Sequence, residues 1–103
     1  MKVFISSPMR GSTKEEILAD RKRIEDEIRA RFKDEEISII DSYFQEFDAA
    51  RAEINISVYF LGRSILKLAE ADLVVFDKGW EKARGCRIEH AIAQDYDLNI
   101  LLL

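Results

Sequence analysis

Short apolar runs alternate along the chain with stretches in which apolar residues recur every three or four positions. Apolar runs that end at polar or turn-forming residues are typical of buried strands. The pattern predicts four strands, at residues 3–5, 37–40, 73–76 and 100–103. Because the strands are apolar on both sides, they favour a parallel sheet whose two faces are covered by helices.

Three amphipathic helices are predicted between these strands. Their apolar faces carry Ile17, Ile24, Ile28 and Phe32 in the first, Leu61, Ile65, Leu68 and Ala69 in the second, and Ile88, Ala91, Ile92 and Tyr96 in the third. At the start of the first helix, Ser12 and Thr13 precede Glu15 and Glu16, and either pairing makes a capping box. The order of elements alternates between strand and helix from end to end.

This alternation predicts an α/β fold, a doubly wound flavodoxin-like or Rossmann-like sheet of four parallel strands with helices on both faces. With 103 residues, of which 48% are hydrophobic, the chain is expected to form one domain over residues 1–103. Ligands of this architecture bind beyond the carboxyl ends of the strands, where the strand order reverses. The segments SSPMRG, DSYF and DKGWEKARG are expected to meet there.

Composition excludes several classes of function. The net charge of -4 argues against binding a nucleic acid polymer, which needs a basic face, but leaves room for a small anionic metabolite. Cys86 is alone, so no intramolecular disulfide forms and cysteine usage fits a reducing cytoplasm. The start of the chain lacks the apolar stretch of a signal peptide, and no run approaches the roughly 18 residues that span a membrane. We therefore expect a cytoplasmic protein without a membrane partner.

The loop after the first strand, SSPMRG, has two interpretations. It is either a turn that leads into a helix cap, or an anion site in which backbone N–H groups and Arg10 face a phosphate. Its spacing matches neither a Walker loop nor a GxGxxG fingerprint, so no nucleotide cofactor is expected. On the second interpretation the ligand contacts come from Ser6, Ser7, Met9, Arg10 and Gly11.

The segment GWEKARGCRIEH follows the third strand and opens a helix. Trp80 is either a packing residue or a wall on which a base stacks. Gly85 either shapes the helix start or lets a ligand approach the backbone closely. Further contacts to a ligand are predicted from residues at the same edge of the sheet, namely Asp41, Trp80, Arg84 and Gly85.

Glu89 is the candidate catalytic residue. It falls in the second turn of the third helix, beside the apolar face, where a carboxylate would be partly desolvated. The alternative is an exposed Glu that the helix dipole stabilises. His90 adjoins it, but neighbours on a helix point about 100° apart, so a catalytic pair is not expected. One His and one Cys give no metal-ligand spacing, and we predict no metal site.

The segments SSPMRG and GWEKARGCRIEHAIA resemble the nucleoside 2-deoxyribosyltransferase-like superfamily, and within it small phage and bacterial proteins of largely unknown function. The resemblance covers nearly the whole chain. It implies that Glu89 attacks C1′ of a deoxyribose, that the base departs, and that water or another base resolves the glycosyl-enzyme ester. It also implies that Arg10 and Gly11 hold a 5′ phosphate. Such two-step chemistry agrees with covalent retaining glycosyl transfer.

Four positions depart from the family pattern. Ser64 stands where active relatives place an Asp that contacts the sugar or helps with proton transfer, so the resemblance implies that Ser64 contacts the substrate. Ala83 stands where the relatives have Ser or Asp, Arg87 where they have Gly, and Phe4 where they often have Tyr. The leading interpretation is still an enzyme, an N-glycosidase or deoxyribosyltransferase that acts on a deoxynucleoside or its monophosphate. The alternatives are a non-catalytic nucleotide-binding module and an interaction domain that docks through residues 43–47.

A homo-oligomer, most simply a dimer, is also expected. The chain carries more exposed-prone aromatic surface than a lone monomer usually shows, from Tyr43, Phe44, Phe47, Tyr59 and Phe60. The resemblance points the same way, because the enzymes of the superfamily complete their pockets with residues from a neighbouring chain. Asp48 and Glu53 are candidates for the carboxylate that Ser64 does not supply.

Overall fold

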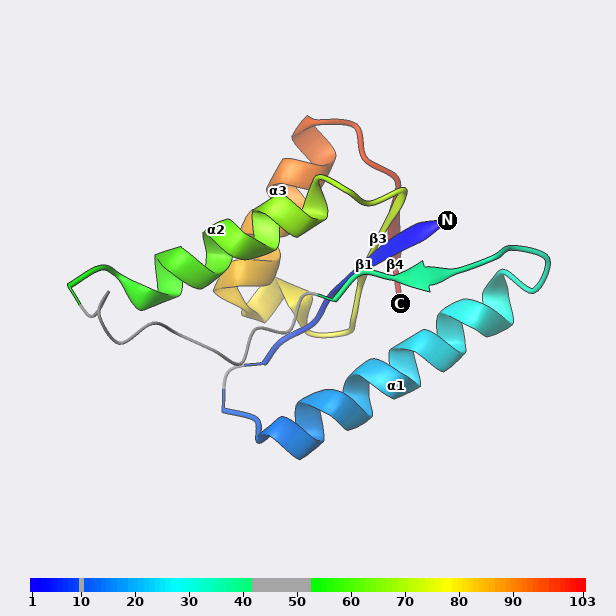
Figure 1. The fold of residues 1–103 in the computed structure, drawn as a ribbon, viewed down its shortest axis with the longest axis horizontal. Helices are drawn as coiled ribbons and strands as arrows, with labels where there is room; N and C mark the ends of the chain where they lie inside the picture. The colour runs from blue at the N-terminus through cyan, green and yellow to red at the C-terminus, as the bar shows by residue number, and fades with distance from the viewer. Residues whose placement is uncertain (10, 42–52) are drawn as a thin grey trace.

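The computed structural model describes residues 1–9, 11–41 and 53–103 of the chain (Figure 1). Its sheet has four strands, and every neighbouring pair is parallel. The strands lie in the order β2-β1-β3-β4 and span β1 Lys2–Ser6, β2 Ser38–Ile39, β3 Leu73–Phe76 and β4 Ile100–Leu102. The four predicted strands are therefore confirmed, with β2 shorter than its apolar run.

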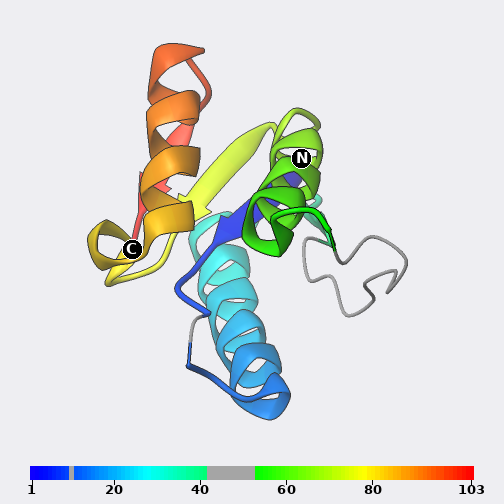
Figure 2. The ribbon, with the colours of Figure 1, turned by 90° about the vertical axis from the view of Figure 1, so that its left-hand side faces the viewer.

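Helices cover both faces of this sheet. Helix α1 (Lys14–Arg31) lies on one face, while α2 (Ile56–Leu68) and α3 (Arg84–Asp95) lie on the other (Figures 1 and 2). The chain runs from β1 through α1 to the edge strand β2, and then through α2 to β3 on the opposite side of β1. The predicted flavodoxin-like, Rossmann-like α/β architecture is confirmed.

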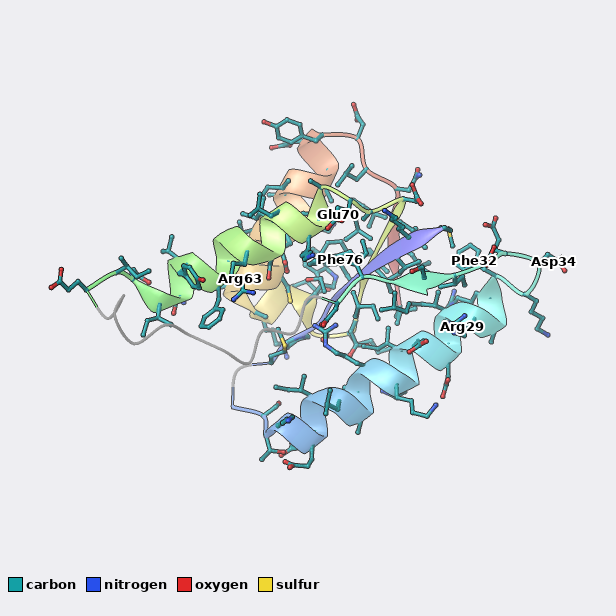
Figure 3. The ribbon with its side chains drawn as sticks, in the orientation of Figure 1. Arg29, Phe32, Asp34, Arg63, Glu70 and Phe76 are labelled. Atoms are coloured by element: carbon teal, nitrogen blue, oxygen red, sulfur yellow. The ribbon has the colours of Figure 1, made fainter. Side chains whose placement is uncertain are left out.

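Alternation along the strands divides the core into two halves. Val3, Ile5 and Val75 pack against the α1 residues Ile24 and Ile28. The intervening strand residues pack on the side of α2 and α3, where they form a second cluster made of Phe4, Leu68, Val74, Phe76 and Ala93. Successive side chains of a strand point to opposite faces, so the two short central strands supply both halves. Figure 3 shows Phe76 near the middle of the molecule.

Helix α1 begins at a capping box. Thr13 accepts a hydrogen bond from the backbone N–H of Glu16, and the Glu16 side chain accepts one from the backbone N–H of Thr13. Of the two predicted pairings, the structure has the one that starts at Thr13. The predicted face is also confirmed, since Ile17, Ile24 and Ile28 are buried and Phe32 packs against the same half of the core at the end of the helix (Figure 3).

The predicted apolar face of α3 is confirmed at only one position. Ile92 is half-buried and packs against the second core cluster, whereas Ile88, Ala91 and Tyr96 are exposed. The fully buried side chains of α3 are Cys86, Glu89 and Ala93. These positions follow the same helical spacing, rotated by about one residue from the predicted set. An apolar count misses this face because one of its buried residues is a carboxylic acid.

Helix α2 is capped by Asn55, whose side chain accepts a hydrogen bond from the N–H of Val58. Among its predicted face residues Leu68 is buried and Leu61 and Ile65 are half-buried, whereas Ala69 is exposed at the C-cap. The aromatic residues Tyr43, Phe44 and Phe47, and Asp48, lie outside the described residues. The homo-oligomer therefore stays a prediction. Among the helices that the structure describes, none is long and apolar enough to cross a membrane.

Candidate functional site

A cavity of about 790 Å³ lies at the carboxyl ends of β1 and β3. Its walls come from β1 and the loop after it (residues 4–9), from α1, from α2, and from the segment that runs from Gly79 into α3. The strand order reverses here, because the chain leaves β1 toward β2 on one side and reaches β3 on the other. Adjacent connections diverge at such a point, and the gap between them is where ligands bind in open α/β sheets.

Glu89 lines this cavity from the buried face of α3. Its side chain is nearly enclosed, with a relative exposure of 7%, and Ser6 in β1 is 2% exposed. The Ser6 hydroxyl donates a hydrogen bond of 2.8 Å to Oε1 of Glu89. Ser6 lies two residues beyond Phe4 and so points to the same sheet face, the one that α3 covers.

Burial raises the pKa of Glu89 to about 7, from an ordinary value of 4.5. Water stabilises a carboxylate more than a neutral acid, so removing it favours the protonated form. The hydrogen bond from Ser6 and the positive charge of Arg21 lower the pKa and only partly offset this effect. The group is therefore close to the midpoint of its titration near neutral pH.

Cys86 lies one helical turn before Glu89 and is also buried. Burial raises the pKa of its thiol, while a hydrogen bond with Ser6 acts in the opposite direction. At neutral pH the thiol stays protonated, which makes it part of the wall rather than a nucleophile.

The cavity is cationic although the chain is acidic overall. The charged side chains that line it are Arg21 from α1, Lys82, Arg84 and Arg87 near the start of α3, and Glu89. Among the described residues of the lining, Glu89 is the only acid. Four cations and one buried carboxyl group line the cavity, and this excess of positive charge favours an anionic ligand, because hydrogen bonds between a cation and an anion are the strong ones.

The segment from Gly79 to the start of α3 forms one wall of the cavity. Gly79 adopts a φ of 90°, a left-handed conformation that side chains disfavour, and its α-carbon faces Pro8 of the loop after β1. A short 3-10 helix, η2 (Trp80–Lys82), then leads to α3, whose N-cap is Ala83. Its N-cap residue, Ala83, makes no side-chain hydrogen bond to the first N–H groups of the helix, and Arg84 and Gly85 of this first turn line the cavity.

Most of the predicted site residues lie together. The cavity is lined by Ser6, Ser7, Met9, Ser64, Arg84, Gly85 and Glu89, and by the departing positions Phe4, Ala83 and Arg87. Gly11, Asp41 and Trp80 are described but are not among the lining residues. Arg10 lies outside the described residues, so its proposed contact with phosphate stays a prediction.

Trp80 packs against the core cluster on the sheet face that α2 and α3 cover. Its ring stacks on His90 with 4.1 Å between ring centroids and an angle of 18° between the planes, and it also packs against Phe76. Of the two interpretations of Trp80, this placement favours packing. It also gives His90 an aromatic partner, which agrees with the expectation that His90 and Glu89 do not act as a pair.

Sequence reasoning missed the contributions of α1 and most of those of α2. Arg21 lies four residues after Ile17 and three before Ile24, so a cation interrupts the buried stripe of α1. Ser57, Leu61 and Ser64 line the cavity from one face of α2. The signal was available in both helices, because a polar residue on an otherwise apolar face is a candidate for a site.

Asp77, the acid that follows β3, does not take part in the cavity lining. It is buried, and its carboxylate accepts a hydrogen bond of 2.8 Å from Arg23 of α1. That hydrogen bond is the main cause that raises the pKa of Arg23. The described part of the chain contains no cluster of three or more acidic, His or Cys side chains that could hold a metal ion.

Comparisons of the chain with protein families, curated proteins and solved structures gave no match. What stands is the fold, an α/β sheet of four parallel strands. Residues 6–9 of the first quoted motif, and residues 79, 82–87 and 89 of the second, line the cavity.

The raised pKa of Glu89 predicts a pH-dependent stability. The folded chain holds this proton more tightly than the unfolded chain, so the contribution is complete below about 4.5 and is lost as the pH rises through about 7. Glu89→Gln imitates the protonated acid and cannot ionise, so the variant does not lose this stability as the pH rises. We expect the variant to gain on the order of 3 kcal/mol relative to the parent between about pH 4.5 and pH 8.

Chemical denaturation at a series of pH values measures this difference. Glu70→Gln is the matched control, because Glu70 is an exposed acid at the opposite end of the sheet (Figure 3). A constant difference in free energy of unfolding between Glu89→Gln and the parent over this range would contradict the buried, proton-holding state of Glu89.

Proposed function

We propose that this chain cleaves or transfers the N-glycosidic bond of a deoxynucleoside or its 5′-monophosphate, with Glu89 as the nucleophile. One observation carries the proposal: a single buried carboxyl group, held by Ser6, lines a cationic cavity at the switch point of the sheet. The cavity volume of about 790 Å³ lies in the range of small-molecule sites. The motif resemblance supports the same reaction.

The reaction proceeds in two displacements. A carboxylate oxygen of Glu89 forms a bond to C1′ as the C1′–N bond breaks, and the electron pair of that bond leaves with the base, which takes a proton from water. Water then attacks C1′, loses a proton to solvent and returns the carboxylate. A second base in place of water gives transfer instead of hydrolysis. Splitting one difficult displacement in two is the general advantage of a covalent nucleophile.

The environment of Glu89 suits this role. A nucleophile must be ionised, and a pKa of about 7 leaves a substantial carboxylate fraction at neutral pH. Burial removes the water that would otherwise solvate the charge, so the carboxylate stabilises the positive charge that develops on the sugar ring. Activity is therefore expected to rise with pH through the region near 7.

The cations of the cavity wall are the proposed phosphate site. Arg84 and Gly85 lie at the first turn of α3, where a guanidinium group, backbone N–H groups and the helix dipole all favour an anion. Arg10 stays part of this proposal, because it follows Met9, which lines the same cavity. The monophosphate is then the preferred substrate over the nucleoside.

A second function, nucleotide binding without turnover, is favoured by one observation. Ser64 lines the cavity at the position where the resembled enzymes carry an Asp, and Glu89 is the only acid of the described lining. Without a second carboxylate, no acidic side chain of the lining assists the departing base. A chain that binds nucleotides tightly and releases no base would have this function.

The reaction is tested with a panel of deoxynucleosides and their 5′-monophosphates, with free base measured by chromatography. We expect the parent to release base, and Glu89→Gln to reduce that rate by about a thousandfold or more because the attacking group is gone. Glu70→Gln, at the opposite end of the sheet, should release base at the parent rate. Undiminished base release by Glu89→Gln would exclude Glu89 as nucleophile.

Calorimetric titration tests the phosphate site. We expect the monophosphate to bind more tightly than the nucleoside, and Arg84→Ala to lose about tenfold or more of that preference, because hydrogen bonds to charged groups are worth about 1.5–3 kcal/mol. Lys78→Ala is the control, since Lys78 is an exposed cation outside the cavity lining. Equal affinity of the parent for nucleoside and monophosphate would count against a phosphate site.

A further inference from the structure

The backbone of Ser6 is fixed by the central strands of the sheet. Ser6 is the last residue of β1 and stands opposite Phe76 in the register with β3. Its carbonyl oxygen accepts a hydrogen bond of 3.0 Å from the N–H of Asp77. Central strands are the most rigid part of such a domain, so the position of the Ser6 hydroxyl is set before any ligand arrives.

The hydroxyl of Ser6 has a defined acceptor at the cavity. It donates to Oε1 of Glu89 over 2.8 Å, and both side chains are more than nine-tenths buried. The bond joins residues 83 positions apart in the sequence and ties α3 to β1. Holding one carboxyl oxygen removes rotational freedom from a side chain that would otherwise choose among several rotamers.

The other charged groups that line the cavity with Glu89 come from α1, η2 and α3. They are Arg21 from α1, Lys82 from η2, and Arg84 and Arg87 from α3 itself, with the neutral thiol of Cys86 one turn away. Arg87 donates a hydrogen bond to the backbone oxygen of Glu81, which directs its guanidinium toward η2. From β1 and α2, the polar residues of the lining are the uncharged Ser6, Ser7, Ser57 and Ser64.

We propose that Ser6 is the positioning residue of this site: its hydroxyl holds Oε1 of Glu89 and so assigns the other oxygen, Oε2, to attack the sugar. This inference rests on the proposed function. Ser6 acts through Glu89 and forms no bond to the substrate. Neither the motif resemblance nor the sequence pattern assigned this positioning role to Ser6.

The same hydrogen bond serves both displacements. Before the first, a donor at Oε1 stabilises the ionised form of Glu89 and increases the fraction that can attack. After Oε2 bonds to C1′, Oε1 is the carbonyl oxygen of the ester and keeps its donor. When water attacks C1′, the C1′–Oε2 bond breaks and its electron pair returns to the carboxylate, whose charge Ser6 again stabilises.

Removal of the hydroxyl gives a directional test. In Ser6→Ala, the titration midpoint of Glu89 is expected to rise by about one to two pH units, because a hydrogen bond to a charged group is worth about 1.5–3 kcal/mol. Carbon-13 NMR of the labelled carboxyl groups measures this midpoint, with Glu89→Gln to assign the signal. Base release near neutral pH should fall about tenfold or more in kcat with little change in KM.

Three further variants separate positioning from a structural role. Ser6→Thr keeps the hydroxyl and should restore the parent midpoint and pH profile. Ser6→Cys keeps the size with a weaker donor, and gives a smaller upward shift that stays measurable if Ser6→Ala does not fold. Ser38→Ala removes an exposed hydroxyl from the edge strand β2 and should leave the midpoint unchanged.

The outcomes distinguish this inference from the proposed function. An unchanged Glu89 midpoint in folded Ser6→Ala or Ser6→Cys overturns the role of Ser6, even if the parent releases base. A shifted midpoint in a parent that releases no base from any substrate supports the hold of Ser6 on Glu89 and overturns the reaction. A shift together with the selective loss of kcat supports both.

Discussion

The burial of one carboxyl group at the end of the central strands is the constraint on which the site depends. Glu89 faces the core side of α3 rather than solvent, and the hydrogen bond from Ser6 makes this placement tolerable. A buried carboxyl without a donor would cost several kcal/mol as an anion, so the acid stays protonated until the pH approaches 7. Folding stability is therefore highest when Glu89 is protonated, whereas the proposed reaction needs Glu89 ionised.

The sheet topology explains why this group has room around it. Because β1 connects to one neighbour through α1 and β3 lies on the other side, α1 and α3 cover opposite faces and diverge above the ends of the strands. The divergence brings Arg21, the start of α3 and the inner face of α2 around one cavity. The net charge of the chain gives no hint of this, since the described acids other than Glu89 lie outside the cavity lining and several on α1 pair with Lys or Arg of the same helix.

The local pattern of apolar and polar residues was enough to predict the fold, but it predicted only part of the site. The run Leu73–Phe76 became β3 without change, because a fully buried parallel strand leaves an unbroken apolar signature. On α3 the same logic found only Ile92, because the most buried face carries an acid, Glu89, that apolar periodicity treats as surface. The contact that holds Glu89 comes from Ser6, 83 residues away in the sequence. Arg21 was missed for the same reason, since its neighbours in space come from other elements.

Stereochemistry is the most direct test of Glu89 as a covalent nucleophile. In water with added methanol, a deoxynucleoside substrate should yield some methyl 2-deoxyriboside, whose anomeric configuration proton NMR identifies. Double displacement through Glu89 predicts the β anomer, the configuration of the substrate, because two inversions at C1′ restore it. Exclusive formation of the α anomer would mean a single displacement by the acceptor, and would contradict a glycosyl-enzyme ester on Glu89.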